Sequence, residues 1–140
     1  MNFTQSISTC MRKYVTFSGR ATRSEFWWFC LFSVLVNLAT TSQAPSFVPF
    51  LLETQDMTAH ESSYFLNNFF FLYLSTITSL ILLLPSLAVA VRRLHDVGRS
   101  GWWILIAFTV IGIIPLLIWY VTDTKDEENI YGPNPKTENA

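Results

Sequence analysis

No lysine or arginine occurs between Arg23 and Arg92. The chain has nine basic residues, and all except Lys125 and Lys136 lie in two segments beside long apolar runs. Basic residues gathered at the ends of apolar runs are typical of membrane proteins, whose short cytoplasmic segments are enriched in lysine and arginine. We therefore expect both basic segments to lie on the cytoplasmic face of a membrane.

The composition excludes an ordinary soluble domain. Hydrophobic residues make up 51% of the 140 residues and charged residues only 14%, whereas soluble domains carry about 25% charge. The net charge of −1 hides a separation of charge, because acidic residues gather in 42–63 and after residue 121. The length fits a single membrane domain, 1–140.

Residues 3–17 have the pattern of an amphipathic helix. Apolar side chains such as Phe3, Ile7 and Cys10 recur at helical spacing, with Arg12 and Lys13 on the opposite side. Such a helix can lie in the headgroup region of a membrane. The alternative is a helix packed on the membrane spans of the same protein.

Three membrane spans follow along the chain. Thr22 and Glu25 predict a capping box that begins the first span, 26–43. The acidic segment 44–63 forms an outer loop that could re-enter the membrane, and the uncharged run 64–91 forms the second span.

The last apolar run, 102–121, has the length of a bilayer and contains a single polar residue, Thr109. It predicts a third span, which would follow a basic inner loop, 92–101. Aromatic residues that mark membrane interfaces stand at the ends of the first and third spans: Trp27, Trp28, Trp102, Trp103, Trp119 and Tyr120. We expect an all-α integral membrane protein with three transmembrane helices and a short N-terminal interfacial helix. The N-terminus would be cytoplasmic and the acidic tail, 122–140, periplasmic.

If the spans pack together, charged residues from both basic segments converge at one membrane surface. This cluster consists of Arg20, Arg23, Glu25, Arg92, Arg93, His95, Asp96 and Arg99. One interpretation is an ion-pair network that holds the helix ends together, with Glu25 and Asp96 as partners of the arginines. The second is recognition of anionic lipid headgroups, and both can hold at once.

A third interpretation, catalysis or ion translocation by His95 and Asp96, has little support. Adjacent residues of a helix point in different directions, so this pair is not a catalytic dyad by itself. We recognise no nucleophile motif, metal-ligand triad or phosphate-binding glycine loop. Cys10 and Cys30 fit the role of small apolar fillers. We expect no enzyme activity, cofactor, metal or nucleic-acid partner.

Three motifs in order carry a resemblance to a known family: SGRATRSEFWWF (18–29), LPSLAVAVRRLHDVGRSGWW (84–103) and ENIYGPNP (128–135). The chain resembles the bacterial inner-membrane family called domain of unknown function 805, over nearly its whole length. The resemblance implies a small multi-span plasma-membrane protein and brings no established activity. The matching positions are Gly19, Arg20, Arg23, Glu25, Trp27, Arg92, Arg93, Leu94, His95, Asp96, Ser100, Trp102, Trp103, Asn129, Tyr131, Gly132 and Pro135.

The chain departs from that family's pattern in its long acidic loop and in the tail DTKDEEN (123–129). A tail that bears a motif would be expected to dock near the arginine motif, which requires one crossing fewer or one more. We retain three crossings because 102–121 is short for a hairpin.

The leading hypothesis is a non-enzymatic scaffold whose basic cytoplasmic face contacts anionic lipid, a partner membrane protein or a second copy of the chain. The alternative is an accessory subunit, or a component of small-solute or ion transport, that uses the charged cluster. The two differ in whether solute flux depends on His95 or Asp96.

Overall fold

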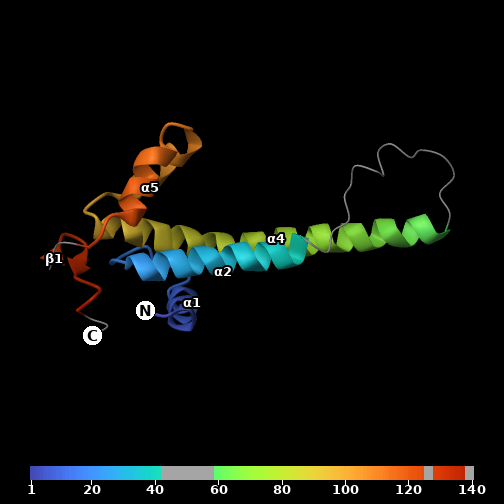
Figure 1. The fold of residues 1–140 in the computed structure, drawn as a ribbon, viewed down its shortest axis with the longest axis horizontal. Helices are drawn as coiled ribbons and strands as arrows, with labels where there is room; N and C mark the ends of the chain where they lie inside the picture. Colours follow the sequence, from blue (N-terminus) through green and yellow to red (C-terminus); the bar gives the residue numbers. More distant parts are fainter. Residues whose placement is uncertain (42–58, 125–127, 138–140) are drawn as a thin grey trace. The chain divides into compact units, whose positions relative to one another are not determined.

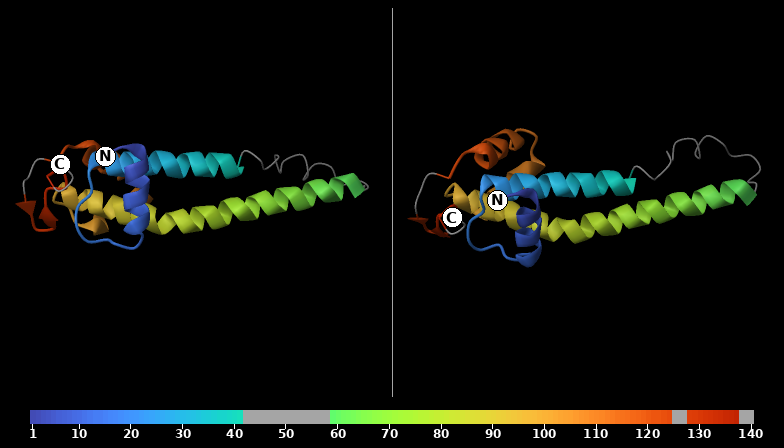
Figure 2. Two further views of the ribbon diagram at one scale, coloured as in Figure 1. Left: turned by 90° about the horizontal axis from the view of Figure 1, so that it is seen from below. Right: turned by 60° about the horizontal axis from the view of Figure 1, so that its bottom comes forward.

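The structure is a computed structural model that describes residues 1–41, 59–124 and 128–137. Most of the expected acidic loop, residues 44–58, lies outside the described residues. The chain divides into two compact units: Met1–Phe32 with Leu83–Ala140, and Ser33–Leu82. The two long helices, α2 (Arg23–Thr41) and α4 (Ala59–Asp96), each contribute residues to both units (Figures 1 and 2).

Helix α1 spans Phe3–Arg12, so it ends earlier than the expected 3–17. Asn2 begins it with a complete capping box: its side chain accepts from the amide of Gln5, at 2.9 Å, and the Gln5 side chain accepts from the Asn2 amide. The face with Ser6 and Cys10 is buried. This burial supports the alternative of a helix packed on the protein's own spans, and a position at the membrane interface stays a prediction.

Only one helix in the described part of the chain, Phe69–Asp96 within α4, is long and apolar enough to cross a membrane. In the second unit, α4 meets α2 through a polar contact, because the Ser79 hydroxyl donates to Asn37 Oδ1 at 2.7 Å. Asn37 in turn donates to the carbonyl of Ser33 on its own helix. Hydrogen bonds between helix side chains of this kind hold membrane helices together.

Helix α4 continues five residues beyond the predicted end of the second span, so residues 92–96 are helical and not part of a loop. The helix ends at Asp96 and is followed by a left-handed glycine, Gly98, with φ of 71°. The amide of Gly98 donates to the carbonyl of His95, and that of Arg99 to the carbonyl of Leu94. This pair of bonds is the Schellman motif, which satisfies the last helix carbonyls.

The prediction of one continuous third span over 102–121 is wrong. The segment folds as a 3₁₀ helix, η1 (Gly101–Phe108), a turn, and a short helix, α5 (Ile113–Val121), that contacts η1. Trp103 and Trp119 lie edge to face with ring centroids 5.5 Å apart. They were expected at opposite interfaces, so the apolar run is a hairpin that returns to its starting end.

The turn of this hairpin depends on Thr109 and Gly112. The Thr109 hydroxyl donates to the carbonyl of Ile106 and accepts from the amide of Gly112. A Cβ atom on Gly112 would lie 2.1 Å from the Ile106 carbonyl oxygen, so a side chain does not fit there. The only polar residue of the run and a glycine therefore make the reversal, and the backbone groups they pair need no water.

The tail forms a small antiparallel hairpin of β1 (Glu128–Asn129) and β2 (Gly132–Pro133). Figures 1 and 2 show it beside the C-terminal end of α4. The Asn129 side chain donates to the carbonyl of His95, and Arg20 donates to the carbonyl of Gly132. The tail is therefore in contact with the basic segments, and the side of the membrane on which it lies stays a prediction.

The hairpin can be tested with a pair of cysteines. In a background with Cys10→Ala and Cys30→Ala, we expect Trp103→Cys and Trp119→Cys to form a disulfide on mild oxidation. The two positions would lie about 24 Å apart along one continuous helix, because each residue rises about 1.5 Å. A control pair of Trp103→Cys and Val110→Cys, with Val110 in the turn, should not cross-link. Failure of the first pair under conditions that oxidise a positive control would contradict the hairpin.

Candidate functional site

Asp96 is the centre of a buried charged cluster at the C-terminal end of α4. Its Oδ1 accepts from Arg20 Nε at 2.9 Å, and its Oδ2 pairs with Arg93 Nη1 and with the Thr124 hydroxyl. The side chains of Asp96 and Arg93 are completely buried, and that of Arg20 is 1% exposed. One carboxylate thus joins the N-terminal segment, α4 and the segment that follows α5.

Arg93 also closes the C-terminal end of α5. Its guanidinium donates to the carbonyls of Tyr120 and Thr122, and to that of Ala21 in the segment before α2. The last carbonyls of a helix have no partner within the helix and carry partial negative charge, so a cation there is favourable. Arg93 therefore holds the end of the returning hairpin.

A second buried pair joins α2 to α4. Arg92 Nη1 lies 2.7 Å from Glu25 Oε1, and the amide of Ala21 donates to the carbonyl of Arg92. Arg92 Nε and Nη2 are buried without a hydrogen-bond partner among the described residues. The expected capping box is half formed: Thr22 Oγ1 accepts from the Glu25 amide, but the Glu25 carboxylate is committed to Arg92.

Cys10 brings α1 into the same region. Its thiol donates to Glu25 Oε1 over 3.7 Å. Burial, followed by the nearby negative charge of Glu25, raises the pKa of Cys10 to about 12. The group is therefore a neutral thiol at physiological pH, with the inert character of a buried structural cysteine.

His95 faces the tail and not Asp96. Its ring stacks on the Tyr131 ring with centroids 3.9 Å apart and planes 2° apart. Its Nδ1 lies 3.2 Å from the carbonyl oxygen of Gly19. Asp96 is occupied by arginines and Thr124, so these neighbouring residues do not form an acid–base dyad in this structure.

The remaining two members of the predicted cluster are exposed. Arg23 pairs with Asp123 at 3.0 Å, and Arg99 lies over the Trp119 ring at 5.1 Å from its centroid. The sequence-based set therefore divides into a buried network and two arginines at the surface. Sequence reasoning missed Thr124 and the backbone carbonyls that serve as acceptors, since neither carries a motif of its own.

The expected aromatic belt divides in a similar way. The side chains of Trp27, Trp28, Trp102 and Trp103 are between 39% and 80% exposed, which fits contact with a membrane interface. Tyr120 was expected in the same belt but is buried, with its ring stacked on that of Phe26 at 4.4 Å. It serves packing of α5 on α2.

The chemistry of the buried network suits a structural role, in which ion pairs hold chain segments together. A buried charge is tolerated only when it is paired and hydrogen-bonded, and each carboxylate here already contacts the arginines that surround it. Removal of one partner from such a pair typically costs about 3–5 kcal/mol, because the other charge stays buried. The cluster can hold elements together, but its carboxylates have little capacity left for a ligand.

We therefore predict that Asp96→Ala lowers the free energy of unfolding by about 3–5 kcal/mol, since it removes the buried carboxylate that pairs with both Arg20 and Arg93. Thermal unfolding of the detergent-solubilised protein would measure the change. Arg12→Gln, at an exposed site, is the control and should unfold near the wild-type temperature. Equal unfolding temperatures for Asp96→Ala and the wild type would refute a stabilising network.

Comparison with known proteins gives a consistent match. The family model "Protein of unknown function (DUF805)" matches residues 14–133. The inner membrane protein YhaI of Escherichia coli K12 is 35% identical over 127 residues, which are 90% of this chain and 91% of YhaI. The inner membrane protein YhaH of the same organism is 34% identical over 132 residues, 91% of this chain and 93% of YhaH. No solved structure matches the chain. The chain belongs to the DUF805 family.

Proposed function

We propose that this protein is a non-enzymatic scaffold of the bacterial inner membrane whose exposed basic residues contact anionic lipid headgroups. The observation that carries the proposal is the separation of its charges. Arg20, Arg92 and Arg93 are buried in ion pairs, whereas Arg12, Lys13, Arg23 and Arg99 are exposed. Only the second group has side chains that can reach a headgroup.

Two of the exposed cations, Arg23 and Arg99, lie beside tryptophan rings. Arg23 and Trp27 line the same cavity, and Arg99 lies over Trp119. Tryptophans with lysine and arginine side chains are characteristic of the membrane interface, where the ring contacts lipid and the charge contacts phosphate. The names of YhaI and YhaH, both inner membrane proteins, support the same location for this chain.

We further propose that α4 crosses the membrane, that α2 crosses it beside α4 although its 19 residues are shorter and more polar than a full span, and that η1 and α5 re-enter it from the same side. Several contacts support this arrangement, because the segment before α2, the end of α4, the end of α5 and the tail all meet in one network. The basic residues concentrated there favour the cytoplasm. Both termini would then be cytoplasmic.

The transport alternative finds no comparable support in the part of the chain that the structure describes. His95 is stacked on Tyr131, and Asp96 is paired with two arginines. A proton or ion path would need one of them to change partners. A docked membrane protein or a second copy of the chain remains an alternative partner for the exposed basic residues.

Topology is tested by a reporter at the C-terminus. We expect a green fluorescent protein fusion to fluoresce and an alkaline phosphatase fusion to be inactive, because both reporters would stay in the cytoplasm. Fusions at residue 56, within the predicted outer loop 44–63, provide the opposite control. An active phosphatase at the C-terminus would contradict the re-entrant hairpin and restore an odd number of crossings.

Lipid contact is tested by neutral substitution of exposed basic residues. Each basic side chain near an anionic surface contributes about 1 kcal/mol, which is roughly fivefold in affinity. We expect Arg12→Gln, Lys13→Gln and Arg99→Gln each to reduce retention of phosphatidylglycerol on the purified protein by a factor of that order, with little change in thermal stability. A variant that carries all three substitutions should lose most of the bound phosphatidylglycerol. If it retains as much phosphatidylglycerol as the wild type, the lipid-contact proposal is wrong.

A further inference from the structure

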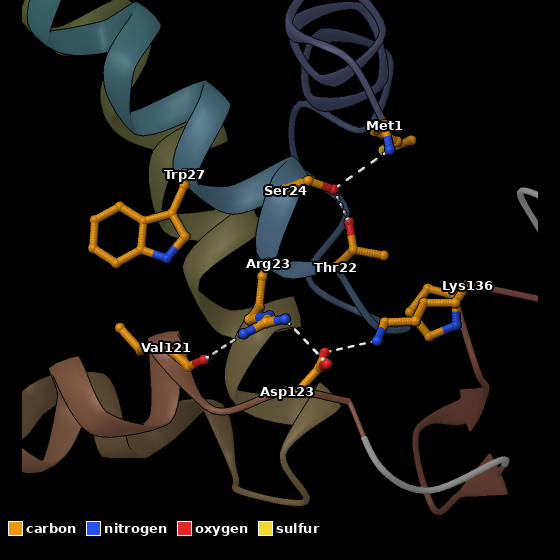
Figure 3. A pocket seen from close by; sticks show the side chains of 9 residues that line it. Met1, Thr22, Arg23, Ser24, Trp27, Val121, Asp123 and Lys136 are labelled. Atoms are coloured by element: carbon orange, nitrogen blue, oxygen red, sulfur yellow. Dashed lines mark hydrogen bonds and ion pairs between the residues drawn. The ribbon is translucent and has the colours of Figure 1, made fainter.

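A cavity of about 570 Å³ lies where the tail meets the beginning of α2 (Figure 3). All of its walls belong to the first compact unit. It is lined by Met1, Thr22, Arg23, Ser24, Trp27, Val121, Asp123, Pro135 and Lys136. The buried network around Asp96 contributes none of these residues, so the cavity is a separate feature of the molecule.

Two cations in this cavity share one carboxylate. Asp123 Oδ2 lies 3.0 Å from Arg23 Nη2, and Asp123 Oδ1 lies 2.7 Å from Lys136 Nζ. Figure 3 shows the Arg23 guanidinium between Asp123 and the carbonyl of Val121, to which it donates at 3.2 Å. The hydrogen bond from Lys136 lowers the pKa of Asp123 below its usual value, so the group is a carboxylate at neutral pH.

These ion pairs differ from the buried ones in their exposure. The side chains of Arg23, Asp123 and Lys136 are 44%, 42% and 46% exposed, whereas those of Arg93 and Asp96 are completely buried. Ion pairs in contact with water contribute little to stability. The carboxylate of Asp123 can therefore be exchanged for another oxyanion without loss of the fold.

The other walls suit a phosphate group attached to an apolar body. The Thr22 and Ser24 hydroxyls lie 3.1 Å apart at the start of α2, and hydroxyls there can donate to phosphate oxygens. The guanidinium of Arg23 can bind two oxyanion oxygens at once. Trp27, 43% exposed, forms an apolar wall beside these polar groups.

We propose that this cavity binds a phosphate monoester between Arg23 and Lys136, and that Asp123 occupies the place of the phosphate when the ligand is absent. The ligand could be a lipid headgroup or a soluble phosphate ester, since both present the same oxyanion. The lipid case deepens the headgroup contact proposed above and rests on it. The soluble case does not.

The test uses two probes with the same phosphate chemistry: phosphatidic acid in detergent micelles, followed by native mass spectrometry, and glycerol 3-phosphate, followed by ³¹P NMR. We expect Arg23→Gln and Lys136→Gln each to weaken binding at least fivefold, because each removes one of the two cations. Asp123→Asn should strengthen binding severalfold, because it removes the competing carboxylate. A gain of affinity cannot result from misfolding, so this variant keeps the test decisive.

Arg99→Gln is the matched control for glycerol 3-phosphate binding, since it removes the same charge from an exposed site that does not line the cavity. Binding of both probes with the expected order of variants supports a general phosphate site. Binding of phosphatidic acid alone supports a headgroup site, and binding of glycerol 3-phosphate alone supports a site for soluble esters. Binding of neither probe, or affinity that is unchanged in Asp123→Asn, overturns the proposal.

The outcome is separable from that of the scaffold proposal. If the triple substitution of Arg12, Lys13 and Arg99 leaves phosphatidylglycerol retention unchanged while the cavity variants still alter glycerol 3-phosphate binding, the scaffold proposal fails and the cavity remains. If retention falls in the triple variant and the cavity variants behave as wild type, the cavity fails alone.

Discussion

The structure depends on the hydrogen-bond acceptors that surround three buried arginine side chains. Among the described residues, Glu25 and Asp96 are the buried carboxylates that pair with Arg20, Arg92 and Arg93. The remaining positive charge is met by backbone carbonyls, with Arg93 on the carbonyls at the end of α5 and Arg20 on that of Gly132. Guanidinium groups present five donors in a fixed plane, so they can bridge several chain segments at once. The need of these arginines for acceptors brings the hairpin and the tail to the end of α4.

The need of Arg93 for acceptors also helps explain why residues 102–121 fold as a hairpin and not as the continuous span that the sequence predicted. Residues 102–121 have the length, apolarity and flanking tryptophans of a crossing, and these properties alone predict one. The hairpin instead depends on Thr109 and Gly112. A transmembrane helix can contain one polar residue and one glycine, so these two residues did not argue against a span in the sequence. The stability of the hairpin depends further on Arg93, which contacts the last carbonyls of α5. No local pattern reports a contact between residues so far apart in sequence.

Other features were accessible from the sequence because their causes are local or electrostatic. The separation of Arg23 from Arg92 by a stretch without basic residues led to the expectation that the two basic segments meet, and the Glu25–Arg92 pair joins them. Gly98 follows the end of α4 with a positive φ, a position at which glycine is the usual residue. The solvent exposure of each arginine could not be predicted from the sequence, because charge alone does not distinguish a buried arginine such as Arg92 from an exposed one such as Arg99. That difference arises from the packing of α1, α2 and the tail around the end of α4.

The tail motif acquires a physical meaning from the same network. Asn129 caps the carbonyl of His95, Tyr131 stacks on its ring, and the carbonyl of Gly132 accepts from Arg20. Gly132 has φ of 129°, which favours glycine and lets the chain reverse between β1 and β2. Each of these residues contacts the RRLHD segment (92–96) or the loop before α2. The three motifs of the sequence therefore belong to one contact network. In this chain the charges that hold the fold together, such as Arg93 and Asp96, are buried, whereas the ion pair of Arg23 with Asp123 is exposed.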